Sequence, residues 1–139
     1  MTILSTRNSQ KGVMLLEAMI SILIFSLGIL ALIGLQARAI NSVSDASYRS
    51  QAAFFADQII GQIWIDRTNM ANYSLPAGTA PALNAWLARV NNALPGTVAN
   101  PPQISVNAAT GQVTVTVNWQ PPGAGAPHSQ TATAQVANP

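Results

Sequence analysis

Hydrophobic residues follow three different patterns along the chain. From Val13 to Ala37 they form a continuous run that contains a single charged residue, Glu17. From Arg38 to about Asn69 they recur at spacings of three, four and seven, which is typical of one face of a helix. After Ser74, short segments alternate apolar and polar residues between Pro- and Gly-rich stretches, as β-strands do. The patterns predict a long helix followed by a small domain of mixed structure.

The apolar run is long enough to cross a membrane. At about 1.5 Å per residue, a helix over residues 13–37 measures about 37 Å, whereas a hydrocarbon core is about 30 Å thick. All nine prolines lie at or after Pro76, so none interrupts a helix before that residue. We therefore expect one helix from Val13 to about Thr68, with residues 13–37 spanning a membrane and residues 38–69 packing on the domain that follows. The expected packing face consists of Ala46, Ala53, Phe55, Ala56, Ile59, Ile60 and Ile63.

Residues 70–139 are expected to form a small α+β head. A short amphipathic helix is predicted before Pro95-Gly96, and strands are predicted in PQISVNA, in QVTVTVNW and, more weakly, in SQTATAQV. Ala109-Thr110-Gly111 is predicted to be the hairpin loop between the first two strands. An antiparallel sheet of this size needs a cover for its apolar face, and we expect the amphipathic half of the long helix to supply it. The apolar positions of the short helix are Leu83, Trp86, Leu87, Val90 and Leu94.

The charged residues are few and scattered, at six Lys and Arg against four Asp and Glu. They form no basic stripe, so no direct nucleic-acid contact is expected. The chain has no cysteine, which excludes disulfides and thiolate metal sites. His128, the single histidine, lies in a Pro/Gly-rich connection without a neighbouring Asp or Glu in the sequence, and we expect a solvated loop residue there. No activated nucleophile or paired carboxylates are evident, so neither an enzyme nor a cofactor is predicted.

Two expectations concern other polar and aromatic residues. Asp45 and Arg49 have the i,i+4 spacing of an intrahelical ion pair. The three tryptophans, Trp64, Trp86 and Trp119, lie on apolar faces and are expected in the core, and one left uncovered would mark an interface.

Glu17 is the residue whose position most needs an explanation. A charge at the centre of a spanning helix costs about 2.5 to 3.5 kcal/mol on insertion scales, although less near the membrane surface. One interpretation is that Glu17 lies at the interface and reaches the headgroups. The other is that the chain is cut after Gly12, which would create an amino group at Val13, one helical turn from the carboxylate. Such an amine, in the same or a neighbouring chain, would be a partner for Glu17.

A different cleavage is also conceivable. Ala37-Arg38-Ala39 is an A-x-A sequence after the apolar stretch, which is typical of secretory signals and would give a mature chain that begins at Ile40. The apolar run is, however, longer than the usual signal-peptide core of about 7 to 15 residues.

Lys11-Gly12 followed by VMLLE and the long apolar run resembles the class III signal peptide of type IV prepilins and type II secretion pseudopilins. Further along, FSLGILALIGLQARAI, ALNAWLARVNNALPG and GQVTVTVNW are similar to minor pilins of the PilV family. This resemblance implies a pilin-like fold, a long N-terminal helix, transmembrane in its first half, packed on a small antiparallel sheet. It also implies removal of leader residues 1–12 by cleavage between Gly12 and Val13, N-methylation of Val13, and pairing of Glu17 with the amino terminus of a neighbouring subunit during assembly.

The chain departs from the family in three respects. Val13 replaces the more usual Phe or Met, Gly34 stands where major pilins carry a helix-bending proline, and a C-terminal cysteine pair is missing. The last two differences point to a minor rather than a major pilin.

The function that the resemblance implies is a minor pilin that helps to initiate assembly of the type IV pilus, a fimbrium, and so supports twitching motility or cell adhesion. The implied partners are a prepilin peptidase and N-methyltransferase, other minor pilins, the major pilin, the inner-membrane assembly platform and the lipid bilayer. The implied location is the inner membrane, single-pass with the head in the periplasm, and then the pilus at the cell surface. The alternatives are a type II secretion minor pseudopilin, a tip-exposed adhesin or binding module, and an uncleaved single-pass membrane protein.

Overall fold

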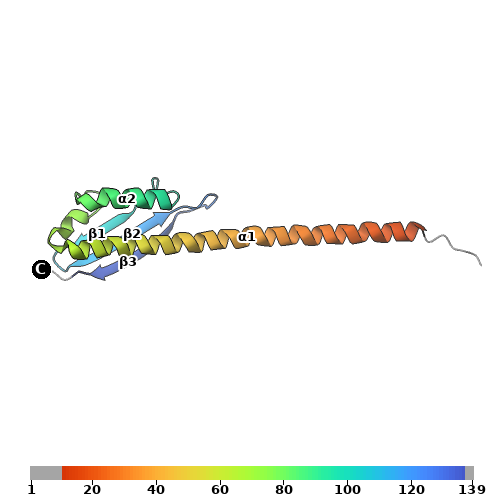
Figure 1. The fold of residues 1–139 in the computed structure, drawn as a ribbon, viewed down its shortest axis with the longest axis horizontal. Coiled ribbons are helices and arrows are strands. Elements are labelled where there is room, and N and C mark those ends of the chain that lie inside the picture. Colours follow the sequence, from red (N-terminus) through yellow and green to blue (C-terminus); the bar gives the residue numbers. More distant parts are fainter. Residues whose placement is uncertain (1–10, 137–139) are drawn as a thin grey trace, which may run out of the picture. The chain divides into compact units, whose positions relative to one another are not determined.

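The structure, a computed structural model, describes residues 11–136. The elements follow one another as α1 (Lys11–Ile65), the 3-10 helix η1 (Arg67–Tyr73), α2 (Pro81–Ala93), β1 (Gln103–Asn107), β2 (Gln112–Trp119) and β3 (His128–Gln135) (Figure 1). The chain divides into two units between Ser42 and Val43, and we call residues 43–136 the head. A long apolar N-terminal helix followed by a three-stranded antiparallel sheet confirms the predicted α+β class.

α1 is a single helix of 55 residues. It contains Gly28, Gly34 and Gly61 without a break, as the absence of proline predicts. It begins two residues before the predicted Val13 and ends at Ile65, earlier than the predicted Thr68.

The early end of α1 is explained by Asp66. Its backbone leaves the helical region at φ −107° and ψ 41°, and η1 follows. The Asp66 carboxylate accepts hydrogen bonds from the side-chain amide of Asn69 at 2.8 Å and from the Tyr73 hydroxyl at 3.1 Å. A short polar side chain that bonds to groups following it in the chain competes with continuation of the helix. These contacts stabilise the change from α1 to η1.

The sheet has the order β1-β2-β3, with both pairs antiparallel. The predicted strands QVTVTVNW and SQTATAQV correspond to β2 and β3, and the predicted hairpin loop lies between β1 and β2. Gly111 closes that hairpin at φ +70°, where a Cβ atom would also collide with the carbonyl oxygen of Val136. Only glycine fits this position.

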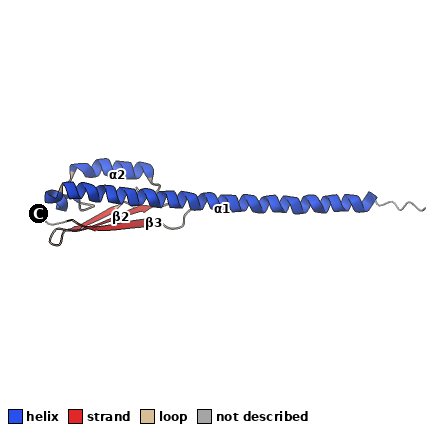
Figure 2. Ribbon diagram, turned by 60° about the horizontal axis from the view of Figure 1, so that its bottom comes forward, coloured by secondary structure: helices blue, strands red, loops and turns tan. Residues whose placement is uncertain are grey.

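The core of the head lies between one face of the sheet and the two helices, as Figure 2 shows. β2 contributes every second residue, so that Val113, Val115, Val117 and Trp119 are all buried. Trp86 of α2 is buried as well, and its indole Nε1 donates a 3.0 Å hydrogen bond to the backbone oxygen of Phe55 in α1. The head part of α1 is therefore a cover of the sheet, as predicted.

The predicted packing face of α1 is largely confirmed. Five of its seven residues are buried, namely Phe55, Ala56, Ile59, Ile60 and Ile63. Ala53 is half-buried, whereas Ala46 is exposed, and Ala52 is buried although it was not predicted.

Candidate functional site

The apolar part of α1 contains the first candidate site. The large hydrophobic residues between Val13 and Leu35 are all exposed, from 42% at Ile29 to 70% at Met14 and Phe25. This helix is long and apolar enough to span a membrane. Exposed apolar surface of this extent marks contact with lipid or protein. Residues 13–37 thus have the length and the surface of a membrane segment.

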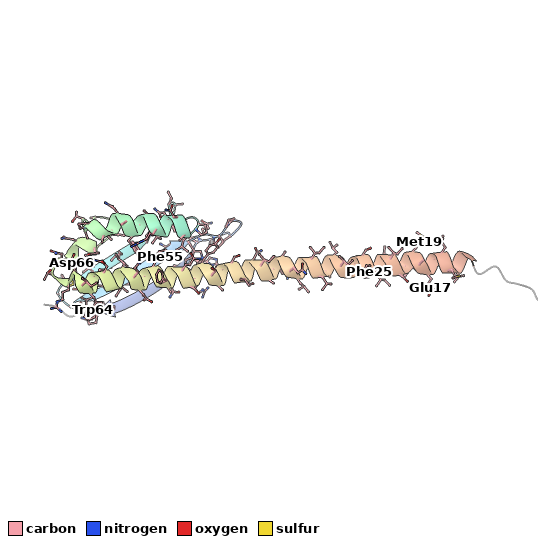
Figure 3. All side chains as sticks on the ribbon, in the orientation of Figure 1. Glu17, Met19, Phe25, Phe55, Trp64 and Asp66 are labelled. Carbon is pink, nitrogen blue, oxygen red and sulfur yellow. The ribbon has the colours of Figure 1, made fainter. Side chains whose placement is uncertain are left out.

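Glu17 is exposed on this helix and makes no ion pair with another described residue, since both recorded ion pairs involve Asp45. Figure 3 shows Glu17 near the start of α1, between the apolar side chains that surround it on the helix. Among the described residues Glu17 is thus a lone carboxylate on an apolar stretch of helix, and its role in assembly stays a prediction.

The predicted cleavage point lies at the very start of α1. Gly12 and Val13 belong to its first turn, in which the backbone N–H groups have no acceptor within the helix. Among the described residues, and apart from the neighbouring helix backbone, no group lies within 4 Å of the position that a Gly12 Cβ would occupy. Glycine also lowers the cost of unwinding a helix by about 1 kcal/mol relative to alanine. The first turn around the Gly12–Val13 peptide bond is thus expected to unwind more easily than the middle of the helix. The rest of the predicted leader, residues 1–10, lies outside the described residues.

The spacing of Val13 and Glu17 matters if this bond is cut. Residues four apart are neighbours on a helix surface, with Cβ atoms about 5 to 6 Å apart. A free amino group at Val13 and the Glu17 carboxylate would then lie on the same side of the helix end. Such an end would present both charges to an adjacent helix.

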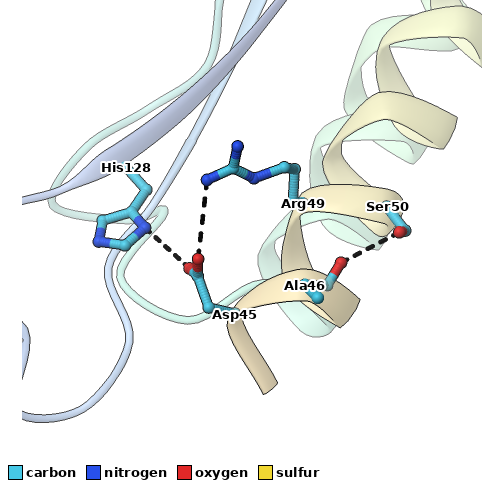
Figure 4. Close-up of polar contacts among 5 residues, drawn as sticks. All are labelled: Asp45, Ala46, Arg49, Ser50 and His128. Carbon is cyan, nitrogen blue, oxygen red and sulfur yellow. Dashed lines mark hydrogen bonds and ion pairs between the residues drawn. The ribbon is translucent and has the colours of Figure 1, made fainter. Parts of the chain in front are cut away.

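A second polar cluster lies in the head and joins α1 to β3 (Figure 4). His128 Nδ1 lies 2.8 Å from Asp45 Oδ1, and Arg49 contacts the other carboxylate oxygen at 3.7 Å. The His128 ring also meets the Trp119 ring edge-on, with centroids 5.7 Å apart. The predicted pair of Asp45 and Arg49 is confirmed. The prediction of a solvated loop histidine is wrong, because the fold brings Asp45 to His128 from a distant part of the sequence.

The cluster connects two elements of the head. Within the part of the chain that the structure describes, no three His, Asp or Glu residues gather as a metal site would require. Asp45 Oδ1 is buried although His128 and Arg49 are partly exposed. The contact thus ties the first residue of β3 to the head part of α1.

Tyr73 and Asp66 form a third polar contact. Burial raises the pKa of the Tyr73 phenol above its ordinary value of 10.0, and the hydrogen bond to Asp66 and the negative charge of Asp66 raise this pKa further. The contact requires the protonated phenol, because only the hydroxyl can donate to the carboxylate.

For Trp64 the prediction of a core position is wrong. Trp86 and Trp119 are buried at 1% and 0% exposure, as predicted, whereas Trp64 is 44% exposed. It lies on the side of α1 away from α2 (Figure 3). The prediction that an uncovered tryptophan marks an interface therefore applies to Trp64 and stays a prediction.

No family model, curated protein or solved structure matches this chain. At the N-terminal end of α1, Gly12, Val13 and Glu17 lie within two helical turns.

Proposed function

We propose that this chain is a minor type IV pilin, a structural subunit that helps to initiate pilus assembly. The observation that carries the proposal is the exposed carboxylate of Glu17, one turn beyond a Gly-Val bond and at the front of residues 13–37, an apolar run with no other charged residue. In this function residues 13–37 hold the subunit in the inner membrane, single-pass, with the head in the periplasm. The same residues become part of the filament when the subunit leaves the membrane.

The energetics favour a paired state for Glu17. An unmatched charge in apolar surroundings costs several kcal/mol, and a partner of opposite charge in good geometry offsets part of that cost. Cleavage after Gly12 supplies the match, because it creates an amino group at the end of every mature subunit. A helix that offers both a carboxylate and an amine is attracted to a neighbour that does the same. Glu17 thereby favours association of helices over isolation in the lipid.

The proposed role is structural rather than catalytic. A prepilin peptidase that also N-methylates Val13 would process the chain. Its later partners would be other minor pilins, the major pilin and the inner-membrane assembly platform. Pilus assembly would support twitching motility or adhesion indirectly.

The experiment that tests this proposal is the mass of the native N-terminal peptide, measured in membrane and sheared-pilus fractions. A peptide that starts at Val13 and carries one extra methyl group is the expected result. A start at Ile40 would instead indicate a secreted domain, and an intact leader would indicate a plain membrane anchor. Either of these would overturn the proposal. Presence of the processed chain in sheared pili separates a pilin from a type II secretion pseudopilin, which shares the same processing.

A matched variant tests the peptidase step. We expect Gly12→Leu to accumulate with its leader attached, because a bulky residue replaces the small one at the bond to be cut. The variant Gly28→Leu adds the same side chain to α1 away from this bond and should be processed normally. Unchanged cleavage of Gly12→Leu, read from the same peptide masses, would contradict the proposed signal.

A further inference from the structure

The two edges of the sheet differ in their hydrogen bonds. The outer edge of β1 is covered by the segment that follows η1. There the backbone N–H of Leu75 donates to the Ile104 oxygen at 2.9 Å, and the Ser74 hydroxyl donates to the same oxygen at 3.3 Å. No hydrogen bond recorded for the described residues covers the backbone of β3 in this way.

The direction of each backbone group of β3 follows from one bond at its end. The Val136 N–H donates to the Gly111 oxygen at 2.7 Å, so the backbone N–H of residue 136 points toward β2. Backbone groups alternate along an antiparallel strand, with every second residue bonded to the same neighbour. The backbone N–H and C=O groups of Gln130, Ala132 and Ala134 therefore point toward β2. The N–H and C=O groups of Ser129, Thr131, Thr133 and Gln135 point outward.

An independent bond supports this alternation. If the backbone groups of Gly111 point toward β3, then those of Val113 and Val115 do so as well. Ile104 is the partner of Val115 in the register of β1 and β2, so Ile104 must point away from β2. The observed bond from Leu75 to the Ile104 oxygen confirms this direction.

β3 is thus an open edge. Its four outward-pointing residues are exposed, and its register with β2 runs through eight consecutive pairs without a bulge. Natural edge strands are usually protected by lysines, prolines, bulges or a covering segment. β3 has no Lys, Arg or Pro. Such an edge is ready to pair with another strand.

The two faces beside this edge have different chemistry. On the solvent face, Thr133 and Thr131 already form hydroxyl contacts with Thr114 and Thr116 of β2, at 3.2 and 3.1 Å. This face is polar and uncharged. On the core face, Ala132 and Ala134 pack against the core but are only partly buried.

Trp64 lies on the same side of the head as this edge. It projects from α1 away from α2 (Figure 3) and retains 44% exposure. β3 runs along the head part of α1 toward the end that carries Trp64, as Figure 1 shows. A strand added beside β3 would therefore extend the sheet on the side where α1 still exposes an aromatic residue.

We propose that the outer edge of β3 is a docking site for an extended segment of another polypeptide, which adds a fourth strand to the sheet. The segment would be uncharged and would alternate apolar and polar residues. Its apolar side chains would cover Ala132, Ala134 and Trp64, and its hydroxyl or amide side chains would continue the row of Thr131 and Thr133. A second copy of β3 fits less well, because its core-facing residues are Gln130 and the two alanines, which are too small to cover a tryptophan. This site is separate from the helix pairing proposed for Glu17.

The test uses the full chain, isotope-labelled in detergent micelles, and a synthetic peptide that copies Gln112–Trp119. This peptide has the required alternation, since β2 already pairs with β3 through it. Hydrogen exchange of individual amides is measured by NMR with and without the peptide. At a peptide concentration about ten times its dissociation constant, the amides of Thr131, Thr133 and Gln135 should exchange about tenfold more slowly. The amides of Ala132 and Ala134 already bond within the sheet and should change little.

Two variants at one position sharpen this test. Thr133→Pro removes an outward N–H and should leave the bonds to β2 intact, because proline is accepted on the free side of an edge strand. It should fold, as judged by circular dichroism, and lose the peptide-dependent slowing. Thr133→Val keeps the N–H and should retain the peptide-dependent slowing of exchange. A scrambled peptide of the same composition should have no effect on either.

Three results would overturn the proposal. The first is unchanged exchange at peptide concentrations of about 1 mM, where even weak specific binding is visible. The second is equal slowing in Thr133→Pro and Thr133→Val. The third is slow exchange of the outward amides without peptide that grows with protein concentration, which would assign the edge to a second copy. None of these results depends on whether the leader is cleaved.

Discussion

Glu17 is the residue on which assembly is expected to depend. We expect Glu17→Ala to be cleaved and inserted normally, because the change leaves Gly12 and Val13 in place and makes the helix more apolar. The variant should fail to enter filaments, since neighbouring amino termini lose their partner. The ratio of this chain in sheared pili and in membranes measures the effect, with a loss of about tenfold or more corresponding to about 1.4 kcal/mol.

The control for this prediction is Ser26→Ala. Ser26 lies in the same apolar helix, and its hydroxyl donates to the Ile22 backbone oxygen of that helix. It should enter filaments normally. Normal incorporation of Glu17→Ala would remove the charge-pairing argument while leaving the cleavage test unaffected.

Tyr73 should make the stability of the head sensitive to alkaline pH. Its pKa is raised in the folded chain, mainly by burial and then by Asp66, so the unfolded chain loses the phenolic proton at lower pH than the folded chain does. The contribution is fully present below about pH 10 and is lost as pH rises through the folded-state pKa. The reason is that the phenolate cannot donate to Asp66 and is repelled by it.

The measurement is the thermal midpoint as a function of pH for the detergent-solubilised chain and for Tyr73→Phe. At neutral pH the variant should be less stable by about 1 kcal/mol, the net value of one hydrogen bond. Above about pH 10 the difference should shrink, because only the native chain has this phenol to ionise. Tyr48→Phe, which removes the other tyrosine, serves as the control. A difference that stays constant up to the alkaline limit would contradict the prediction.

Among the elements, β3 is held to α1 at its first residue by His128 and Asp45. We expect His128→Ala to lower the free energy of unfolding by about 0.5 to 1 kcal/mol, because the pair is partly exposed and therefore screened by solvent. Arg49→Ala should cost less, since its 3.7 Å contact is long and 63% of its side chain is exposed. Urea unfolding of the solubilised chain gives both values.

A double-mutant cycle with Asp45→Asn separates the pair from other effects of the histidine. A coupling energy above about 0.5 kcal/mol is expected for residues in direct contact. Additive effects of His128→Ala and Asp45→Asn would show that the Trp119 contact, rather than the carboxylate, accounts for the role of His128.

The elements also show what the sequence could predict. β2 was predicted to the residue, because four buried apolar positions alternate with polar ones and the sheet is covered on one side only. The end of α1 was not predicted to the residue. Asp66 ends the helix through hydrogen bonds of its own side chain, and no glycine or proline marks this position in the sequence. The pairing of His128 with Asp45 depends on the packing of β3 against α1, and no local pattern contains that information.

For Trp64 and Glu17, the sequence-based predictions had a different limit. The helical spacing puts Trp64 in line with Ile60, but the described sheet is too narrow to cover it, and only the fold reveals this. The spacing of Gly12, Val13 and Glu17 is local and could be taken directly from the sequence. Their proposed partner is another chain, which a single sequence does not contain.

On the scale of the whole molecule, the division of the chain between Ser42 and Val43 predicts that the head folds alone. Among the described residues, every buried core residue lies between Ala52 and Val136. Deletion of residues 1–42 therefore removes none of the buried side chains that the structure describes, and it also removes the exposed apolar surface of residues 13–35. A chain of residues 43–139 should be soluble and should unfold cooperatively, with a free energy of about 5 to 10 kcal/mol. Its urea transition, followed by Trp86 and Trp119 fluorescence, is the measurement.

Ile59→Ala in the same short chain should lower this free energy by about 2 to 5 kcal/mol, because it leaves a cavity between α1 and the sheet. Ile65→Ala, at a position that is 82% exposed, should change it little. A broad transition that Ile59→Ala does not shift would mean that the head needs residues before Val43 to form its core.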